Sequence, residues 1–97
     1  MAQIDTLYFG VCRVGRLSRG KIQITNKKSR AVTISASIQP PFYLPVPSIA
    51  IEPSCFIKYP VHFVPNAIGV FQDSLNFTVE GGPSFVVTLV GKGKEEE

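Results

Sequence analysis

The sequence predicts an all-β domain, a seven-stranded immunoglobulin-like β-sandwich. Apolar and polar residues alternate along most of the chain, which is the period of half-buried strands, and no window carries apolar residues at helical spacing. Gly, Pro and Asn interrupt the alternation at the intervals typical of a sandwich. The chain has 97 residues, of which 44% are apolar, so it is long enough to bury one hydrophobic core.

The first three strands are expected at residues 5–9, 20–26 and 31–39. The first is followed by a glycine, Gly10, and the second alternates Ile22 and Ile24 with polar residues. Val32 begins a longer alternation in the third strand. Residues 15–20 lead into the second strand, and residues 26–30 form a hairpin to the third. Asn26 suits this strand end because asparagine tolerates left-handed backbone geometry.

The last four strands are expected at residues 48–52, 55–64, 70–80 and 84–91. Val61 and Phe63 are core positions of the fifth strand, and Leu75 and Phe77 are core positions of the sixth. Residues 80–83 form the final hairpin. We expect glycines 91 and 93 to release the chain from the sheet. The single domain then spans residues 1–93, and residues 94–97 form a solvated tail or linker.

Prolines disturb the pattern at two places. Four of them fall within residues 40–47 and cannot sit in a central strand, because proline lacks the N–H donor of a ladder. This segment is expected to cross between the sheets, held by Phe42 and Leu44. Pro60 lies inside an otherwise regular strand, so it implies either a bulge or an edge position.

Positive charge is concentrated near the start of the chain. Residues 1–30 carry +6, from seven basic residues and one Asp, whereas residues 31–97 carry −3, from three basic and six acidic residues. We expect two basic clusters at opposite ends of the second strand, ~20 Å apart and joined by Lys21. The candidate partner-binding residues are Arg13, Arg16, Arg19, Lys21, Lys27, Lys28 and Arg30.

An acidic surface is the partner that these clusters predict. Nucleic acid is disfavoured because the basic residues are not interleaved with exposed aromatic residues and the net charge is only +3. A second candidate surface is an apolar strip of Tyr43, Val46 and Ile49 beside the proline-rich segment.

Catalysis and metal binding are not predicted. His62 alternates with core residues and is expected on the surface, and the carboxylates show no paired spacing. Cys12 and Cys55 are most simply free thiols, and together with one histidine they offer too few ligands for a metal. We also expect no secretory leader, and no run approaches the ~20 apolar residues that cross a bilayer.

Several short motifs follow one another along the chain in an order that resembles a known family, the ASH domain. That family is named after the abnormal-spindle, spindle-defective and hydin proteins, and it belongs to the wider group similar to PapD and major sperm protein. The resemblance covers about residues 5–93. The motifs are Phe9-Gly10, Val14-Gly15, Ile22-x-Ile24-x-Asn26, Phe42 with Leu44, Ile51-x-Pro53, Val61-x-Phe63-x-Pro65, Gly69, Leu75-x-Phe77 and Leu89-Val90-Gly91-x-Gly93.

The resemblance implies a non-enzymatic interaction module, without cofactors, in a cytoplasmic protein of the centrosome or of the cilium or flagellum axoneme. Such a module is expected to be monomeric, to lie within a longer multi-domain chain and to bind other proteins. One alternative is an adaptor similar to major sperm protein that binds an acidic peptide at a membrane or cytoskeletal surface. Another is an extracellular adhesion sandwich, for which Cys12 and Cys55 would form a disulfide.

Overall fold

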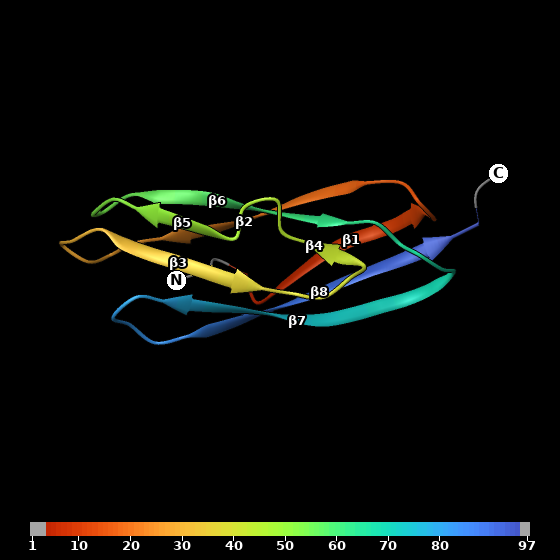
Figure 1. Cartoon of the computed structure of the whole chain (residues 1–97). Coiled ribbons are helices and arrows are strands. Elements are labelled where there is room, and N and C mark those ends of the chain that lie inside the picture. Colours follow the sequence, from red (N-terminus) through yellow and green to blue (C-terminus); the bar gives the residue numbers. More distant parts are fainter. Residues whose placement is uncertain (1–3, 96–97) are drawn as a thin grey trace.

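The computed structural model describes residues 4–95, which form eight β-strands in two sheets and contain no helix (Figure 1). The all-β immunoglobulin-like fold is therefore confirmed, with one strand more than expected. The strands are β1 (Thr6–Arg13), β2 (Ser18–Thr25), β3 (Val32–Ser37), β4 (Phe42–Tyr43), β5 (Ser48–Ile51), β6 (Phe56–Phe63), β7 (Gly69–Val79) and β8 (Phe85–Lys94).

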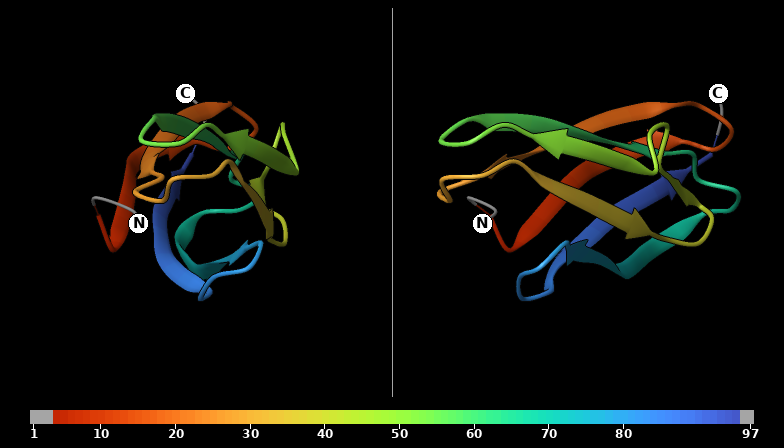
Figure 2. Two further views of the ribbon diagram at one scale, coloured as in Figure 1. Left: turned by 90° about the vertical axis from the view of Figure 1, so that its left-hand side faces the viewer. Right: turned by 60° about the vertical axis from the view of Figure 1, so that its left-hand side comes forward.

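The two sheets lie face to face and make an elongated sandwich of 50 × 19 × 17 Å (Figure 2). The larger sheet has the strand order β1-β8-β7-β3-β5, and the smaller has the order β2-β6-β4. β1 runs parallel to β8, while the other neighbouring strands are antiparallel. Because side chains alternate between the faces of a strand, each sheet turns one face to the core and one to solvent.

The core follows the apolar alternation of the sequence. Phe42 and Phe63 are buried and their ring centroids lie 5.0 Å apart, with the partly buried ring of Phe9 at 5.8 Å and 5.4 Å from them. Contacts between aromatic rings in such clusters add stability beyond that expected from the buried area of the rings. The buried apolar side chains are Ile22, Ile24, Val32, Ile34, Phe42, Ile51, Tyr59, Val61, Phe63, Leu75, Phe77, Val79, Val87 and Leu89.

The additional strand β4 lies inside the proline-rich segment that was expected only to cross between the sheets. Phe42 pairs with Phe63, and Tyr43 pairs with His62. The backbone N–H of Val64 donates to the carbonyl of Pro41 at 2.9 Å and extends the contact. The prolines flank the two paired residues, so they do not interrupt this short ladder. The segment therefore both crosses between sheets and extends the smaller one.

A buried tyrosine fixes the end of the same segment. The Tyr59 hydroxyl donates to the carbonyl of Val46 at 2.9 Å, and its ring packs edge-on against Phe77 with the centroids 5.2 Å apart. Burial raises the pKa of Tyr59 above its usual value of 10.0, because the core disfavours the charged phenolate. The sequence analysis did not assign this role to Tyr59.

Pro60 lies opposite Lys21 in an uninterrupted β2–β6 register, so a bulge is not present there. On the other side of β6, β4 pairs only with residues 62 and 63. Pro60 therefore has an open edge beside it, and the edge alternative is the correct one.

Strands β1 and β8 are longer than expected. β1 passes through a register shift at Tyr8 and Gly10, where Gly10 has a φ of 74°, and continues to Arg13. Glycine allows this conformation without steric cost. β8 continues to Lys94, which pairs with Arg13, so the sheet extends one residue past the expected boundary at residue 93. Residues 96 and 97 of the expected tail lie outside the described part of the chain.

The expectation that two glycines release the chain at the end of β8 is wrong. Gly91 and Gly93 are buried and paired on both sides, with β1 and with β7. A Cβ at residue 91 would lie 2.5 Å from the ring of Phe63, and one at residue 93 would collide with the carbonyl of Ala67. These glycines therefore let the segment after β6 pack directly on β8.

Asn26 is a buried hydrogen-bonding residue and does not adopt the left-handed geometry that we expected; Ser54, with a φ of 59°, is the only non-glycine residue with positive φ among residues 4–95. The Asn26 amide nitrogen donates to the carbonyls of Arg30, Ile51 and Glu52 at 2.8 to 3.2 Å. Residues 26–31 connect β2 of one sheet to β3 of the other, so they are not a hairpin.

Candidate functional site

Six of the seven candidate basic residues are divided between the two ends of the sandwich, as expected. Residues 13, 16 and 19 lie around the connection from β1 to β2, and residues 27, 28 and 30 lie in the connection from β2 to β3 at the other end (Figure 1). Lys21 lies on β2 between the two groups.

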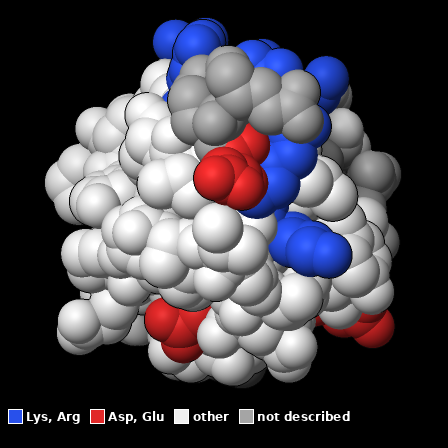
Figure 3. All heavy atoms as spheres, turned by 90° about the vertical axis from the view of Figure 1, so that its right-hand side faces the viewer, with Lys and Arg blue, Asp and Glu red and all other residues white. Residues whose placement is uncertain are grey.

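Two lysines distant in sequence join the first group. Lys92 pairs with Val11 and Lys94 pairs with Arg13, because β8 runs parallel to β1. Figure 3 looks at this end of the molecule and shows Lys and Arg atoms gathered over its upper and right-hand parts. Arg13 and Arg16 interact with other parts of the chain. Sequence reasoning missed the two lysines because the register between β1 and β8 is not local.

The second group has structural contacts that the sequence did not indicate. The Lys28 Nζ donates to the carbonyl of Gly81 at 3.3 Å. The Arg30 guanidinium lies over Gly81, where a Cβ would come within 2.5 Å of its Nη2 atom. Lys28 and Arg30 therefore hold the 26–31 connection against the turn between β7 and β8. Lys27 and Arg30 are exposed, and Lys28 is partly buried.

A third basic surface lies on the outer face of the smaller sheet. Arg19, His62 and Tyr43 pair across β2, β6 and β4 and form one row. Lys21 belongs to the next row, and Lys58, which pairs with Gln23, belongs to the row after that. We call these five residues the small-sheet face. They point outward because they alternate with the inward-facing positions of each strand, which include Ile22, Phe42 and Tyr59.

The small-sheet face is free of acidic side chains. Strands β2, β4 and β6 contain no Asp or Glu. The side chains of Arg19, Lys21 and Lys58 make no hydrogen bond or ion pair with any residue from 4 to 95. Among the described residues, no neighbour therefore pairs with these charges, and the three side chains lie on one face of the smaller sheet.

Exposed aromatic rings accompany these basic residues. The sequence analysis disfavoured nucleic acid because it expected no such rings among them. Tyr43 is 45% exposed, and Phe56, at the far end of β6, is 56% exposed. Tyr43 lies opposite His62, six residues from Phe56, so the two rings are ~20 Å apart along the strand. No second exposed ring therefore lies beside Tyr43 on β6 to stack a neighbouring base.

The expected apolar strip does not form one surface. Tyr43 lies on β4 of the smaller sheet, whereas Ile49 lies on β5 of the larger sheet, pairs with Ile34 and packs against the core. Val46 is 37% exposed, and its carbonyl is occupied by Tyr59. Only Tyr43 and Val46 remain exposed, and they do not form a patch.

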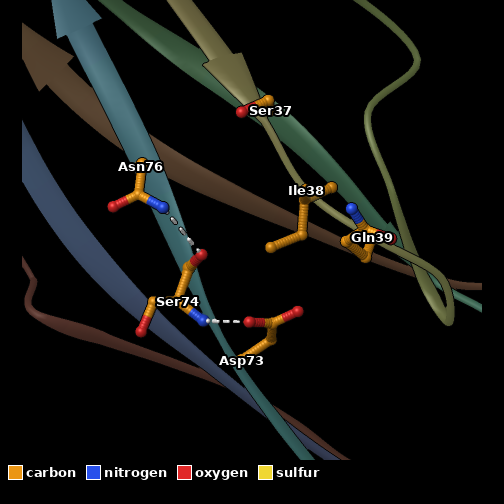
Figure 4. Close-up of a pocket in the computed structure, with 6 residues that line it drawn as sticks. All are labelled: Ser37, Ile38, Gln39, Asp73, Ser74 and Asn76. Carbon is orange, nitrogen blue, oxygen red and sulfur yellow. Dashed lines mark hydrogen bonds between the residues drawn. The ribbon is translucent and has the colours of Figure 1, made fainter.

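A polar hollow of about 210 Å³ opens where β3 separates from β7 (Figure 4). The backbone N–H of Ser74 donates to its neighbour Asp73 at 2.8 Å, and the Asn76 side chain donates to the Ser74 carbonyl at 3.4 Å. These side chains occupy backbone groups that a longer β3 would pair, which protects the edge of β7. The hollow is lined by Ser37, Ile38, Gln39, Asp73, Ser74 and Asn76.

Both cysteines are free thiols, as predicted. Cys12 is partly buried in β1 and its Sγ lies 3.6 Å from the carbonyl of Phe9, while Cys55 is exposed just before β6. Residues 4–95 hold no group of three His, Cys, Asp or Glu side chains arranged to bind a metal. The same residues include no helix long and apolar enough to span a membrane.

The two-sheet topology and the motifs along it define a PapD-like sandwich domain. The chain belongs to the Cep192 domain 8 family, whose model matches residues 1–94. The ASH and PapD-like resemblance expected from the sequence is thereby confirmed. No curated protein matches the chain in sequence.

Solved structures show the same fold at low identity. The ASH/PapD-like domain 7 of human CEP192 superimposes with a TM-score of 0.88 and 15% identity, covering 100% of this chain and 86% of that one. The CupB2 chaperone of Pseudomonas aeruginosa gives 0.74 and 14%, covering 96% and 55%. The MSP-domain protein SSP-19 of Caenorhabditis elegans gives 0.54 and 9%, covering 88% and 92%.

Proposed function

We propose that this chain is a non-enzymatic protein-interaction module of a cytoplasmic protein at the centrosome or at the axoneme of a cilium or flagellum. Membership of the Cep192 domain 8 family supports a centrosomal role. The similar PapD-like domain of human CEP192 supports a module that is one of several in a longer chain. The acid-free basic surface of the smaller sheet is the observation that carries the binding role.

The seven candidate partner-binding residues differ in their contacts within the chain. Lys28 and Arg30 pack on the turn that contains Gly81, so their first role is structural. Arg13 and Arg16 interact within the chain. Arg19 and Lys21 differ, because they extend from a regular strand onto an outer surface that has no acidic residue. We therefore assign partner binding to Arg19 and Lys21.

Localisation in cells tests this function. A fluorescent fusion of residues 1–97 is expected to concentrate at centrosomes or cilia, whereas the fluorescent tag alone stays diffuse. Phe63→Ala provides the unfolded control, since loss of a buried phenylalanine typically costs ~3 to 5 kcal/mol. A folded fusion that distributes like the tag alone in dividing and in ciliated cells would overturn the proposal.

A further inference from the structure

We propose that the small-sheet face binds an extended acidic peptide with carboxylates at alternate positions, i, i+2 and i+4. This inference rests on the proposed interaction function and adds the binding face and the chemistry of its ligand. The five residues involved are Arg19, Lys21, Tyr43, Lys58 and His62, which come from β2, β4 and β6 (Figure 1).

The spacing of the cations carries the argument. Arg19, Lys21 and Lys58 occupy three successive outward rows of the sheet, because Lys58 pairs with Gln23, the outward residue of β2 that follows Lys21. Successive rows on one face are two residues apart, which is ~6.6 to 6.8 Å. In an extended peptide, alternate side chains have the same spacing. Each carboxylate of such a peptide therefore meets one cation.

The first row also offers two further hydrogen-bond donors. His62 lies between Arg19 and Tyr43, and the hydroxyl of Tyr43 and a ring N–H of His62 both donate to carboxylates. A carboxylate at this row therefore meets a charged donor with two further donors beside it. Hydrogen bonds with an ionised partner are shorter and stronger than neutral ones.

Charge complementarity selects the acidic peptide over other occupants. The face has three unneutralised cations and no carboxylate on its three strands. A single-stranded nucleic acid would need neighbouring rings for stacking, but Tyr43 and Phe56 lie at opposite ends of β6. A peptide needs only the regular charge spacing, which the sheet provides.

Binding is measured by fluorescence anisotropy with two labelled peptides of equal composition. One alternates glutamate and threonine, Glu-Thr-Glu-Thr-Glu-Thr-Glu, and the other groups them, Glu-Glu-Glu-Glu-Thr-Thr-Thr. The alternating peptide is expected to bind several-fold more tightly, because only its extended form matches the rows. Equal affinity of the two peptides, or no binding of either at low salt, would overturn the proposal.

Two charge-matched variants test the location of the site. The face variant carries Arg19→Glu, Lys21→Glu and Lys58→Glu, and the control carries Lys27→Glu, Lys92→Glu and Lys94→Glu at the two ends of the sandwich. Each replaces three basic residues by three acidic ones and changes the net charge from +3 to −3. We expect the face variant to bind the alternating peptide roughly tenfold or more weakly than the control does. Because the two variants have the same net charge, such a difference reports the position of the charges.

The remaining outcomes are also decisive. If the control loses as much affinity as the face variant, binding follows net charge and the assigned face is wrong. Anionic lipid vesicles or a single-stranded oligonucleotide could instead bind the parent and not the face variant. If they do so while the alternating peptide does not bind, the peptide is the wrong ligand. A face variant that folds, fails to bind the peptide and still concentrates at centrosomes would support the peptide site while placing the cellular anchor elsewhere. A parent protein that concentrates there without binding any acidic peptide would leave the proposed function intact and reject this site.

Discussion

The Cα of Gly91 in β8 faces the ring of Phe63, and a Cβ at this position would lie 2.5 Å from the nearest ring carbon. Both residues are buried, and the Phe63 ring is also packed against Phe9 and Phe42. The ring therefore has no space into which it can retreat. The glycine is required by this packing, while the backbone of β8 continues regularly through it.

Gly91→Ala is expected to destabilise the domain by ~1 to 3 kcal/mol, which is the usual cost of overpacking a core. Urea unfolding followed by tyrosine fluorescence measures the change. Lys92→Ala is the matched control, because Lys92 is the exposed neighbour on the same strand. If the two variants unfold at the same urea concentration, the close contact with Phe63 does not exist.

Asn26→Ala is expected to be more damaging, with a loss of ~2 to 4 kcal/mol. Its side chain donates to three backbone carbonyls and accepts from the N–H of Lys28 at 2.9 Å, so the substitution leaves several polar groups without partners at a buried position. Asn76→Ala is the control, since the Asn76 side chain is exposed and makes one bond of 3.4 Å. Equal losses in the two variants would show that the hydrogen bonds of Asn26 do not stabilise the fold.

Stability is expected to fall at high pH because of Tyr59. Its folded pKa is raised above 10.0 by burial, so the unfolded chain loses this proton more easily than the folded one. The stability that depends on protonated Tyr59 is fully present below pH 10 and is lost as the pH rises through the pKa of Tyr59 in the folded state. Urea midpoints measured from pH 9 upward should decline less in Tyr59→Phe than in the parent.

The same variant also tests the hydrogen bond to Val46. Below pH 10, Tyr59→Phe should cost ~1 kcal/mol, because the Val46 carbonyl loses its buried donor. Identical pH profiles for parent and variant above pH 10 would mean that Tyr59 is accessible to water in the folded state.

The thiols should differ in reactivity. Cys55 is exposed and Cys12 is partly buried, so a short exposure of the native protein to iodoacetamide should modify Cys55 first. After denaturation without reductant, mass spectrometry should show two adducts on each molecule. Molecules without adducts would contain a disulfide and would contradict the free thiols of the structure.

The sequence predicted most of the core because the period-two alternation determines which residues face inward. Ile22, Ile24, Leu75 and Phe77 are buried as expected from that pattern. Prediction from the sequence failed where contacts between distant segments, and not the local residue pattern, determine the structure. Two paired residues among prolines gave no strand pattern for β4, and Gly91 resembled a strand end because the nearby ring of Phe63 is not visible in a linear sequence.

The candidate site could be predicted only in part for a related reason. Arg19 and Lys21 were identified from their place in a basic stretch of the chain. Lys58, His62 and Tyr43 join them through the register of β6 with β2 and β4, which depends on pairing between distant segments. Lys28 and Arg30 belonged to the same stretch, but folding placed them on the turn around Gly81.

The most direct test is a ¹H–¹⁵N NMR titration of the parent protein with the alternating Glu-Thr peptide. We expect the largest shift changes at the amides of Arg19, Lys21, Lys58 and His62, and we expect them to vanish in 1 M salt, where the screening length falls to ~3 Å. Amides of Lys27 and Arg30, in the connection from β2 to β3, should change little. Shifts that centre on residues 27–30, or that spread evenly over all basic residues, would contradict a binding site on the small-sheet face.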